Sequence, residues 1–218
     1  MFLSKLHFTR FQLIVHALAW LPLLVLIWDG LNDQLTANPI QTITFRTGKF
    51  ALLFLTLSLA ITPLHTLTGW HPLTRVRRPL GVYAFMYAGL HFLTFIGLDY
   101  GFQFQWIIPE IAEKPYIIAG LSALLLLLPL ALTSTTGWQR RLKKNWKRLH
   151  RLAYAAGVAA IVHYIWEVKN HQGEPWVWGA VLACLLVMRV PIVKQTIANW
   201  RLQLRRRRLT TRVPENVV

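Results

Sequence analysis

Histidine is the residue type in this sequence whose positions best suit chemistry inside a membrane. Four histidines lie within long apolar segments and a fifth lies at the end of one: His16, His91, His150, His163 and His65. No Asp or Glu occupies the middle of these segments, and the only Lys or Arg deep in one is Arg189, near its end. Ionisable groups inside a bilayer are costly and by default mark function. The missing carboxylates argue against a proton pump or cation transporter, and the histidines point to metal or haem ligation.

Two of these histidines are expected at the same depth. His91 lies twelve residues beyond Pro79, or about 18 Å at the helical rise per residue. His163 lies thirteen residues beyond His150, or about 20 Å. Two facing histidines at one level suit a six-coordinate haem, whose iron takes one axial ligand from each side. Met86 is the one thioether nearby that could replace an imidazole.

Small residues accompany each member of this pair. With 3.6 residues per turn, each histidine shares an arc of about 80° with three small residues. The two sets are Gly81, Ala84 and Ala88 with His91, and Ala153, Ala156 and Ala160 with His163. Such a face leaves room for a flat macrocycle between two helices. The alternative is a small-residue helix contact, common in membranes, with each histidine hydrogen-bonded to a carbonyl. The matched pair favours haem.

His150 has a different position. It lies roughly 140° around the helix from His163, so it cannot share that haem without a kink. It could ligate a second haem near the cytoplasmic face, with His16 or His65 as the partner. It could equally be a solvated histidine at the membrane boundary, and the sequence leaves both interpretations open.

Six apolar segments must position these residues, and each approaches the roughly 20 residues needed to cross a bilayer. They cover residues 11–28, 47–64, 79–98, 115–133, 149–167 and 175–193. Because strict two-residue alternation is absent, the segments are helices rather than barrel strands. The sequence therefore predicts an all-α integral membrane protein with a six-transmembrane-helix bundle over 11–193. A short N-terminus (1–10) precedes the bundle and a basic tail (194–218) follows it.

The charges predict the orientation of this bundle. Hydrophobic residues make up 55% of the chain and charged residues 15%, yet the formal net charge is +16. If the N-terminus is cytoplasmic, the segments 1–10, 65–78, 134–151 and 189–218 hold 20 of the 24 Lys and Arg residues. Cytoplasmic loops carry such an excess. The expected topology is N-in and C-in, with both ends in the cytoplasm.

The basic clusters could also suggest nucleic-acid binding. They are the run Arg205–Arg208 and the six cations between Arg140 and Arg148. Both lie beside apolar spans, where such clusters attract anionic lipid at about 1 kcal/mol per residue. The partner they indicate is the lipid bilayer and not nucleic acid. A docking surface for a cytoplasmic flavoprotein is compatible with the same clusters.

Other features narrow the chemistry further. The single cysteine, Cys184, excludes an intrachain disulfide, covalent haem attachment through a CxxCH motif and a cysteine zinc site. No GxG occurs, so the dinucleotide fingerprint and the P-loop are both missing. No internal repeat is evident. Redox chemistry here would need a borrowed cofactor held within the membrane.

Several stretches are similar to a known family. They are Thr47–Leu52, Ile61–Leu64, Arg77–Gly81, Leu90–Phe92, Leu132–Ser134, Leu149–Tyr154 and His163–Tyr164. With one histidine in the third helix and two in the fifth, the chain resembles the haem-binding membrane subunits of the bacterial periplasmic methionine sulfoxide reductase system. These belong to the ferric-reductase-like transmembrane superfamily. Lys143 stands where this resemblance leads us to expect a glycine, which bears on the conformation of that loop.

The resemblance implies cofactors and partners that composition and spacing do not reveal. It implies one or two b-type haems, an FMN requirement and a place in the bacterial inner membrane. Electrons would pass from a cytoplasmic flavin reductase, or from quinone, to a periplasmic molybdopterin-containing methionine sulfoxide reductase subunit that repairs oxidised proteins. The chain would be an electron-transfer subunit and not the catalytic one, with haem iron bound by His91, His163 and, less directly indicated, His150.

Four arginines flank the cytoplasmic ends of the third and fifth helices: Arg77, Arg78, Arg148 and Arg151. Guanidinium groups suit a haem propionate or a flavin phosphate, although plain positive-inside anchoring explains each one equally well. Two other functions fit the same sequence. The first is a stand-alone ferric or metal reductase or an oxidase-like haem protein. The second is a non-redox scaffold or transporter with structural histidines.

Overall fold

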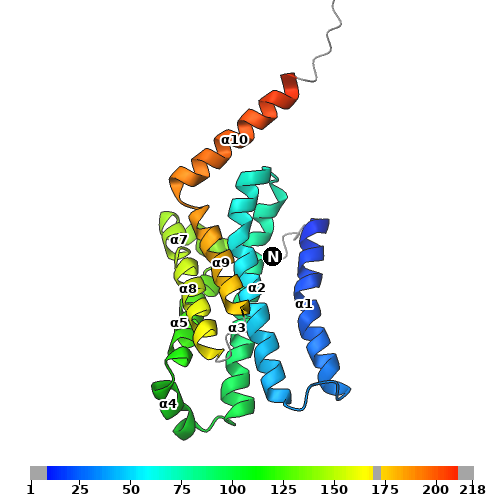
Figure 1. Ribbon diagram of the computed structural model, residues 1–218, viewed down its shortest axis with the longest axis vertical. Coiled ribbons are helices and arrows are strands. Elements are labelled where there is room, and N and C mark those ends of the chain that lie inside the picture. Colours follow the sequence, from blue (N-terminus) through cyan, green and yellow to red (C-terminus); the bar gives the residue numbers. More distant parts are fainter. Residues whose placement is uncertain (1–8, 169–172, 211–218) are drawn as a thin grey trace, which may run out of the picture.

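The computed structural model describes residues 9–168 and 173–210, and every regular element in these ranges is helical (Figure 1). The α-helices are α1 (Arg10–Leu31), α2 (Pro39–Thr68), α3 (Pro72–Leu93), α4 (Phe104–Glu113), α5 (Pro115–Leu132), α6 (Thr136–Leu142), α7 (Lys144–Leu149), α8 (Leu152–Glu167), α9 (Glu174–Val187) and α10 (Pro191–Thr210). A π-helical segment, η1 (Thr94–Asp99), continues α3. The all-helical prediction is confirmed for the described residues.

Local sequence signals set many of the helix ends. Proline occupies the first turn of α2, α3 and α5, where its missing N–H costs nothing and its fixed φ suits the helix. Thr9 and Gln12 form a capping box at the start of α1. Gly69 ends α2 in the left-handed conformation, with φ of 70°, which glycine adopts without strain.

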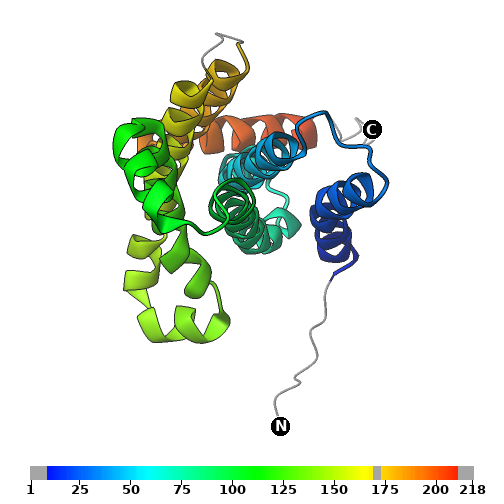
Figure 2. The same cartoon turned by 90° about the horizontal axis from the view of Figure 1, so that it is seen from below.

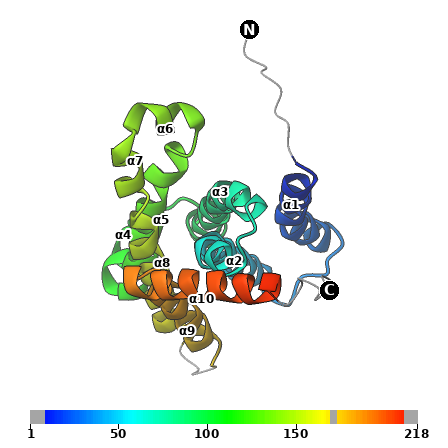
Figure 3. The same cartoon turned by 90° about the horizontal axis from the view of Figure 1, so that it is seen from above.

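Two antiparallel helix pairs form the centre of the molecule. α2 packs on α3, and α5 packs on α8, while α3 contacts α5 and α2 contacts α8. α1 flanks this centre on the α3 side and α9 flanks it on the α8 side, as the views along the bundle show (Figures 2 and 3). We call the end of the bundle that carries α4 the α4 end, and the opposite end, with α6 and α7, the α7 end.

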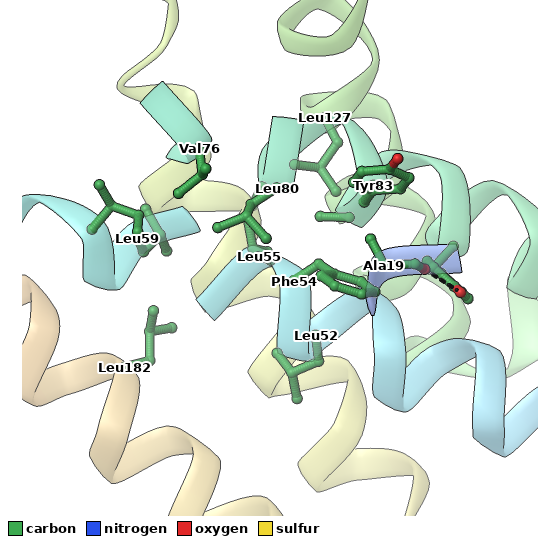
Figure 4. Packing of buried hydrophobic residues seen from close by; sticks show 14 of the residues in the cluster. Ala19, Leu52, Phe54, Leu55, Leu59, Val76, Leu80, Tyr83, Leu127 and Leu182 are labelled. Atoms are coloured by element: carbon green, nitrogen blue, oxygen red, sulfur yellow. Dashed lines mark hydrogen bonds between the residues drawn. The ribbon is translucent and has the colours of Figure 1, made fainter. Parts of the chain in front are cut away.

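The buried core lies along α2. Leu52, Phe54, Leu55 and Leu59 of α2 pack against α3 residues such as Leu80, and α9 adds a leucine at the edge of the cluster (Figure 4). Since burial of a leucine or phenylalanine side chain contributes about 1.5–3 kcal/mol in water but far less against lipid, side-chain packing fixes the pairing of these helices.

The Tyr87 hydroxyl is one of the groups that tie α1 to α3. The Tyr87 side chain is 1% exposed, and its hydroxyl donates to the carbonyl of Ala19 (2.8 Å) and accepts from the backbone N–H of Leu23 (3.1 Å). These two backbone groups are four residues apart, beside Pro22, which interrupts the hydrogen bonding of α1. The hydroxyl therefore bridges backbone groups of a proline-disturbed turn and ties α1 to α3.

Among the described residues, four helices are long and apolar enough to cross a membrane: α1, α2, α3 with η1, and α5. A fifth span is added if α9 and the first part of α10, which are bent by 77° against each other, are taken together. α8 has 16 residues, which is short for a span of about 20. The protein is a multi-pass membrane protein, and six spans remain a prediction.

The predicted segments 47–64 and 79–98 begin later than α2 and α3, which start at Pro39 and Pro72, and two other predicted segments are not continuous helices. The segment 149–167 begins later, because α7 ends at Leu149 and His150 lies in the turn before α8. The segment 175–193 is broken after α9, since Pro191 starts a new helix, as proline does at a first helical position. The predicted tail from 194 is helical as far as Thr210, whereas 1–8 and 211–218 lie outside the described residues.

The loop at Lys143 adopts the backbone conformation that the resemblance anticipates. Lys143 joins α6 to α7 with φ of 47° and ψ of −118°, a region that glycine enters freely and other residues enter at a cost. The lysine therefore keeps a conformation suited to glycine.

Candidate functional site

His91 of α3 and His163 of α8 face each other across the centre of the bundle. Their ring centroids are 5.9 Å apart and their planes are inclined by 78°. The depth count predicts this level, and the structure brings the two rings together there.

Each of these rings is held by a main-chain carbonyl of the neighbouring helix. Nδ1 of His91 lies 2.9 Å from the Thr44 oxygen of α2, and Nδ1 of His163 lies 2.7 Å from the Tyr116 oxygen of α5. A carbonyl can only accept, so Nδ1 carries the proton and Nε2 keeps its lone pair. This arrangement is typical of metal-ligating histidines, whose second nitrogen donates to a carbonyl or carboxylate.

Two glycines let the rings approach these helices. A Cβ atom added to Gly48 would lie 3.1 Å from Nδ1 of His91, and one added to Gly120 would lie 2.8 Å from Nδ1 of His163. A methyl group at either position would press on a flat, rigid ring. The glycines thus provide the space in which each imidazole can reach the carbonyl one turn earlier.

The two halves of this arrangement are equivalent. In each half, the histidine and its carbonyl acceptor are 47 residues apart. An offset of 72 residues along the chain therefore aligns His91 with His163 and Thr44 with Tyr116. The identical pairs that line the cavity are Gly48/Gly120, Ala51/Ala123, Leu52/Leu124, Leu55/Leu127, Ala88/Ala160 and His91/His163. The expectation of no internal repeat is therefore wrong. The repeat escapes notice because the identities recur at helical spacing while the residues between them differ.

These residues line a cavity of about 520 Å³, which we call the paired-histidine cavity. The separation of 5.9 Å between the ring centroids leaves room for one metal ion between the two imidazoles, since a metal–imidazole bond is about 2.0–2.1 Å long. Within the described ranges no third His, Cys, Asp or Glu joins the pair as a ligand group. The remaining ligands would have to arrive with the metal, as porphyrin nitrogens do, and the residues present therefore fit a haem.

The mouth of this cavity at the α4 end is charged. Lys49 pairs with Glu174 at 3.0 Å, and Lys114 pairs with Glu110. Hydrogen bonds from Lys114 and Tyr100 hold the pKa of the Glu110 carboxyl below its usual range. Burial, and then Glu110, raise the pKa of Tyr100, while the hydrogen bond to Glu110 raises the pKa of Lys114.

A second cavity, of about 340 Å³, lies toward the α7 end, and we call it the arginine–histidine cavity. Arg77, Arg78, His65 and His150 all contribute to its lining. Nδ1 of His150 lies 3.1 Å from the Trp146 carbonyl, and its Nε2 is buried without a hydrogen-bond partner. His150 therefore presents a lone pair under the same tautomer argument as the facing pair. With the same offset of 72 residues that relates His91 to His163, the residue that corresponds to His150 is Arg78.

Other predicted residues lie elsewhere. Nδ1 of His16 is 2.8 Å from the Tyr83 hydroxyl, between α1 and α3, and His16 lines neither cavity. Arg148 and Arg151 are exposed and also line neither cavity. Nε2 of His65 is 3.4 Å from Nδ1 of His71. Of the proposed partners for His150, only His65 shares its cavity.

Sequence reasoning missed the residues that support the facing pair. The carbonyls of Thr44 and Tyr116 carry no side-chain signal, because any residue supplies a carbonyl. Gly48 and Gly120 do carry a sequence signal, since each precedes its histidine by the same number of residues along the chain. Lys49 and Lys114 are two of the four cations that lie outside the segments expected in the cytoplasm, and nothing in the sequence alone places them at one cavity.

Comparisons with known proteins show the family of this chain. Residues 47–161 match the family described as "Ferric reductase like transmembrane component". The chain is 47% identical over 183 residues to the protein-methionine-sulfoxide reductase heme-binding subunit MsrQ of Xanthomonas euvesicatoria pv. vesicatoria, covering 81% of this chain and 84% of that protein. The MsrQ proteins of Xanthomonas axonopodis pv. citri and Herminiimonas arsenicoxydans are 46% and 47% identical. They cover 81% and 73% of this chain, and 84% and 75% of their own lengths. The chain therefore belongs to the MsrQ family of protein-methionine-sulfoxide reductase heme-binding subunits, within the ferric reductase like transmembrane components.

Proposed function

We propose that this protein is a haem b-containing electron-transfer subunit of the bacterial inner membrane. It passes electrons from a cytoplasmic flavin or flavin reductase, or from the quinone pool, to a periplasmic molybdopterin-containing methionine sulfoxide reductase that repairs oxidised proteins. The observation that carries the proposal is the facing pair His91 and His163, each with Nδ1 bound to a carbonyl beside one cavity. The names of the relatives support both the haem and the reductase.

In this proposal the α7 end faces the cytoplasm and the α4 end the periplasm. The positive-inside rule supports that orientation, since the connections at the α7 end carry far more Lys and Arg than those at the α4 end. A reporter fused at the C-terminus is expected to behave as cytoplasmic, and one inserted in the 99–103 connection as periplasmic. A periplasmic C-terminus would reverse the proposed direction of electron flow.

Bound haem supplies reversible one-electron exchange at its iron. His91 and His163 would hold the haem, and the Thr44 and Tyr116 carbonyls would fix the tautomer and orientation of their rings. Hydrogen bonding at Nδ1 makes each imidazole a stronger ligand. The leucines along α2 and α5 exclude water from the side of the cavity that lies away from α4.

The arginine–histidine cavity is proposed as the entry point for electrons. His150 offers a buried lone pair there, and Arg77 and Arg78 offer positive charge for a haem propionate or a flavin phosphate. A second haem b with His150 as a ligand, and FMN bound at the same end, are the two occupants this chemistry suits. Arg148 and Arg151, both exposed, would contact a cytoplasmic donor.

The first experiment is the absorption spectrum of the purified protein. A reduced b-type, low-spin spectrum is expected, whereas its absence would favour a non-redox scaffold. His91→Ala and His163→Ala each remove an axial nitrogen, so each should lower haem content or convert the spectrum to high spin. If both variants keep a full low-spin spectrum, the pairing is wrong.

The partner and direction need a separate experiment. Sealed vesicles of known orientation receive a flavin-based donor on one side, and the molybdenum enzyme with methionine sulfoxide on the other. Turnover is expected only with the donor on the side of the α7 end. Haem reduction without transfer to that enzyme, but with reduction of added ferric iron, would favour a stand-alone metal reductase instead.

A further inference from the structure

The paired-histidine cavity is polar at one end only. Away from α4 it is closed by Leu52, Leu55, Leu124 and Leu127. Leu55 and Leu127 also line the arginine–histidine cavity, so they separate the two cavities. Apart from His91 and His163, the polar lining residues come from the segments at the α4 end: Asn38, Gln41, Thr44, Lys49, Asp99, Tyr100, Glu110, Lys114, Tyr116, Tyr164 and Glu167.

Two lysines supply all the positive charge in the described lining of this cavity. Their side chains are 52% and 41% exposed, for Lys49 and Lys114 respectively, and each is paired with one glutamate. Asp99, Glu110 and Glu167 line the same mouth and carry the opposite charge. A lysine ammonium on its flexible stem can exchange one carboxylate partner for another.

We propose that Lys49 and Lys114 bind the two propionate groups of the haem, so that its carboxylate edge faces the α4 end. The inference rests on the proposed haem function and adds the orientation of the group and its anchors. Two carboxylates pressed against the leucines would be unpaired and desolvated, which is strongly unfavourable. At the α4 end the same carboxylates would lie near Asp99, Glu110 and Glu167, which repel them. Both lysines are therefore needed to balance the negative charge.

No arginine can take this role in the described structure. Arg77 and Arg78 line the other cavity, beyond Leu55 and Leu127. Arg46 belongs to the α4 end but pairs with Asp29 and does not line the cavity. The arginines therefore serve a different ligand from the haem between the facing histidines.

The test compares haem with haem dimethyl ester, in which both propionates are neutral. Each pigment is titrated into the full-length apoprotein in detergent, in a His65→Ala, His150→Ala background, so that of the two cavities only the paired-histidine cavity offers a histidine ligand. A charge-assisted hydrogen bond corresponds to about tenfold or more in affinity. We therefore expect haem to bind at least tenfold more tightly than its ester.

Two variants then identify the anchors. The double variant Lys49→Gln, Lys114→Gln should lose the preference for haem over the ester and keep a low-spin spectrum, because both axial histidines remain. The matched control Arg46→Gln removes a cation at the same end and should retain the preference. Lys49→Arg should also retain it, since the charge is kept.

Several results would overturn the assignment. An unchanged preference in the lysine double variant would do so, as would a preference lost in Arg46→Gln or in Arg78→Gln. If the unsubstituted protein binds both pigments equally in low-spin form, the orientation is wrong while haem binding stands. If it binds neither pigment in low-spin form, the proposed function itself fails.

Discussion

Gly120 offers the sharpest test of how the haem ligands are positioned. In Gly120→Ala the new methyl carbon would lie 2.8 Å from Nδ1, 3.0 Å from Cε1 and 3.1 Å from Cγ of His163. Ordinary contacts of this kind are 3.4–4 Å. Because the imidazole is rigid, it cannot yield at one flexible end, and the whole ring must move away from α5. The 2.7 Å contact between Nδ1 and the Tyr116 oxygen is then stretched.

The expected magnitudes separate folding from ligation. Overpacking costs about 1–3 kcal/mol, and replacing glycine by alanine in a helix returns about 1 kcal/mol. The free energy of unfolding should therefore fall by no more than about 2 kcal/mol. Disturbing the hydrogen bond behind a metal-bound histidine typically lowers metal affinity about 10–100-fold, so haem affinity should fall by that factor.

Haem titration followed by absorbance measures this loss, and two other glycines calibrate it. Gly48→Ala places its methyl 3.1 Å from Nδ1 of His91, so a smaller loss, about tenfold or less, is expected there. Gly89→Ala, on α3 with nothing within 4 Å, should leave affinity unchanged. Wild-type affinity in Gly120→Ala, or an equal loss in Gly89→Ala, would refute the reasoning.

Three further predictions follow from the fold. Tyr87→Phe removes both hydrogen bonds between the Tyr87 hydroxyl and the backbone of α1. The free energy of unfolding should therefore fall by about 1–3 kcal/mol, measured by thermal unfolding in detergent, and an unchanged midpoint would contradict the bridging role. Lys143→Gly should raise the free energy of unfolding by about 1–3 kcal/mol in the same assay, because glycine adopts the positive φ of 47° without strain. A lower free energy of unfolding would show that the lysine side chain stabilises the protein. Glu110→Gln should lower the unfolding midpoint between about pH 5 and pH 10, where the ion pair of Glu110 with Lys114 is charged. The pKa of Glu110 is lowered in the folded protein, so the stabilisation by the pair is lost as the pH falls through that pKa. The pKa of Lys114 is raised, so the stabilisation is also lost as the pH rises through the pKa of Lys114. A difference from wild type that persists unchanged at pH 2 would contradict the ion pair.

The level of the two facing histidines follows from local rules. Helical rise alone places His91 and His163 at similar depths, and helical periodicity puts their small-residue stripes on the same faces. A helix in lipid must satisfy its own backbone hydrogen bonds, so long apolar segments leave little choice of local structure. For this reason the membrane class and the candidate ligands can be read without tertiary contacts.

His150 shows where local rules fail. The predicted apolar segment begins at Leu149 and so includes His150, yet the chain turns there, and its ring belongs to a turn before α8 and lines a separate cavity. The break after α9 is similar, because hydropathy does not register the 77° change of direction at Pro191. Bends of this kind depend on how neighbouring helices pack.

The membrane class, the charge asymmetry and the shared level of two histidines can be predicted without a structure, because they depend on composition, helical rise and spacing along one chain. The groups that meet those histidines cannot be predicted in this way. The Thr44 and Tyr116 carbonyls, the clearance at Gly48 and Gly120 and the lysines at the cavity mouth all come from other segments of the chain. Such contacts depend on which helix faces are packed together, and that is a property of the assembled bundle and not of any single segment.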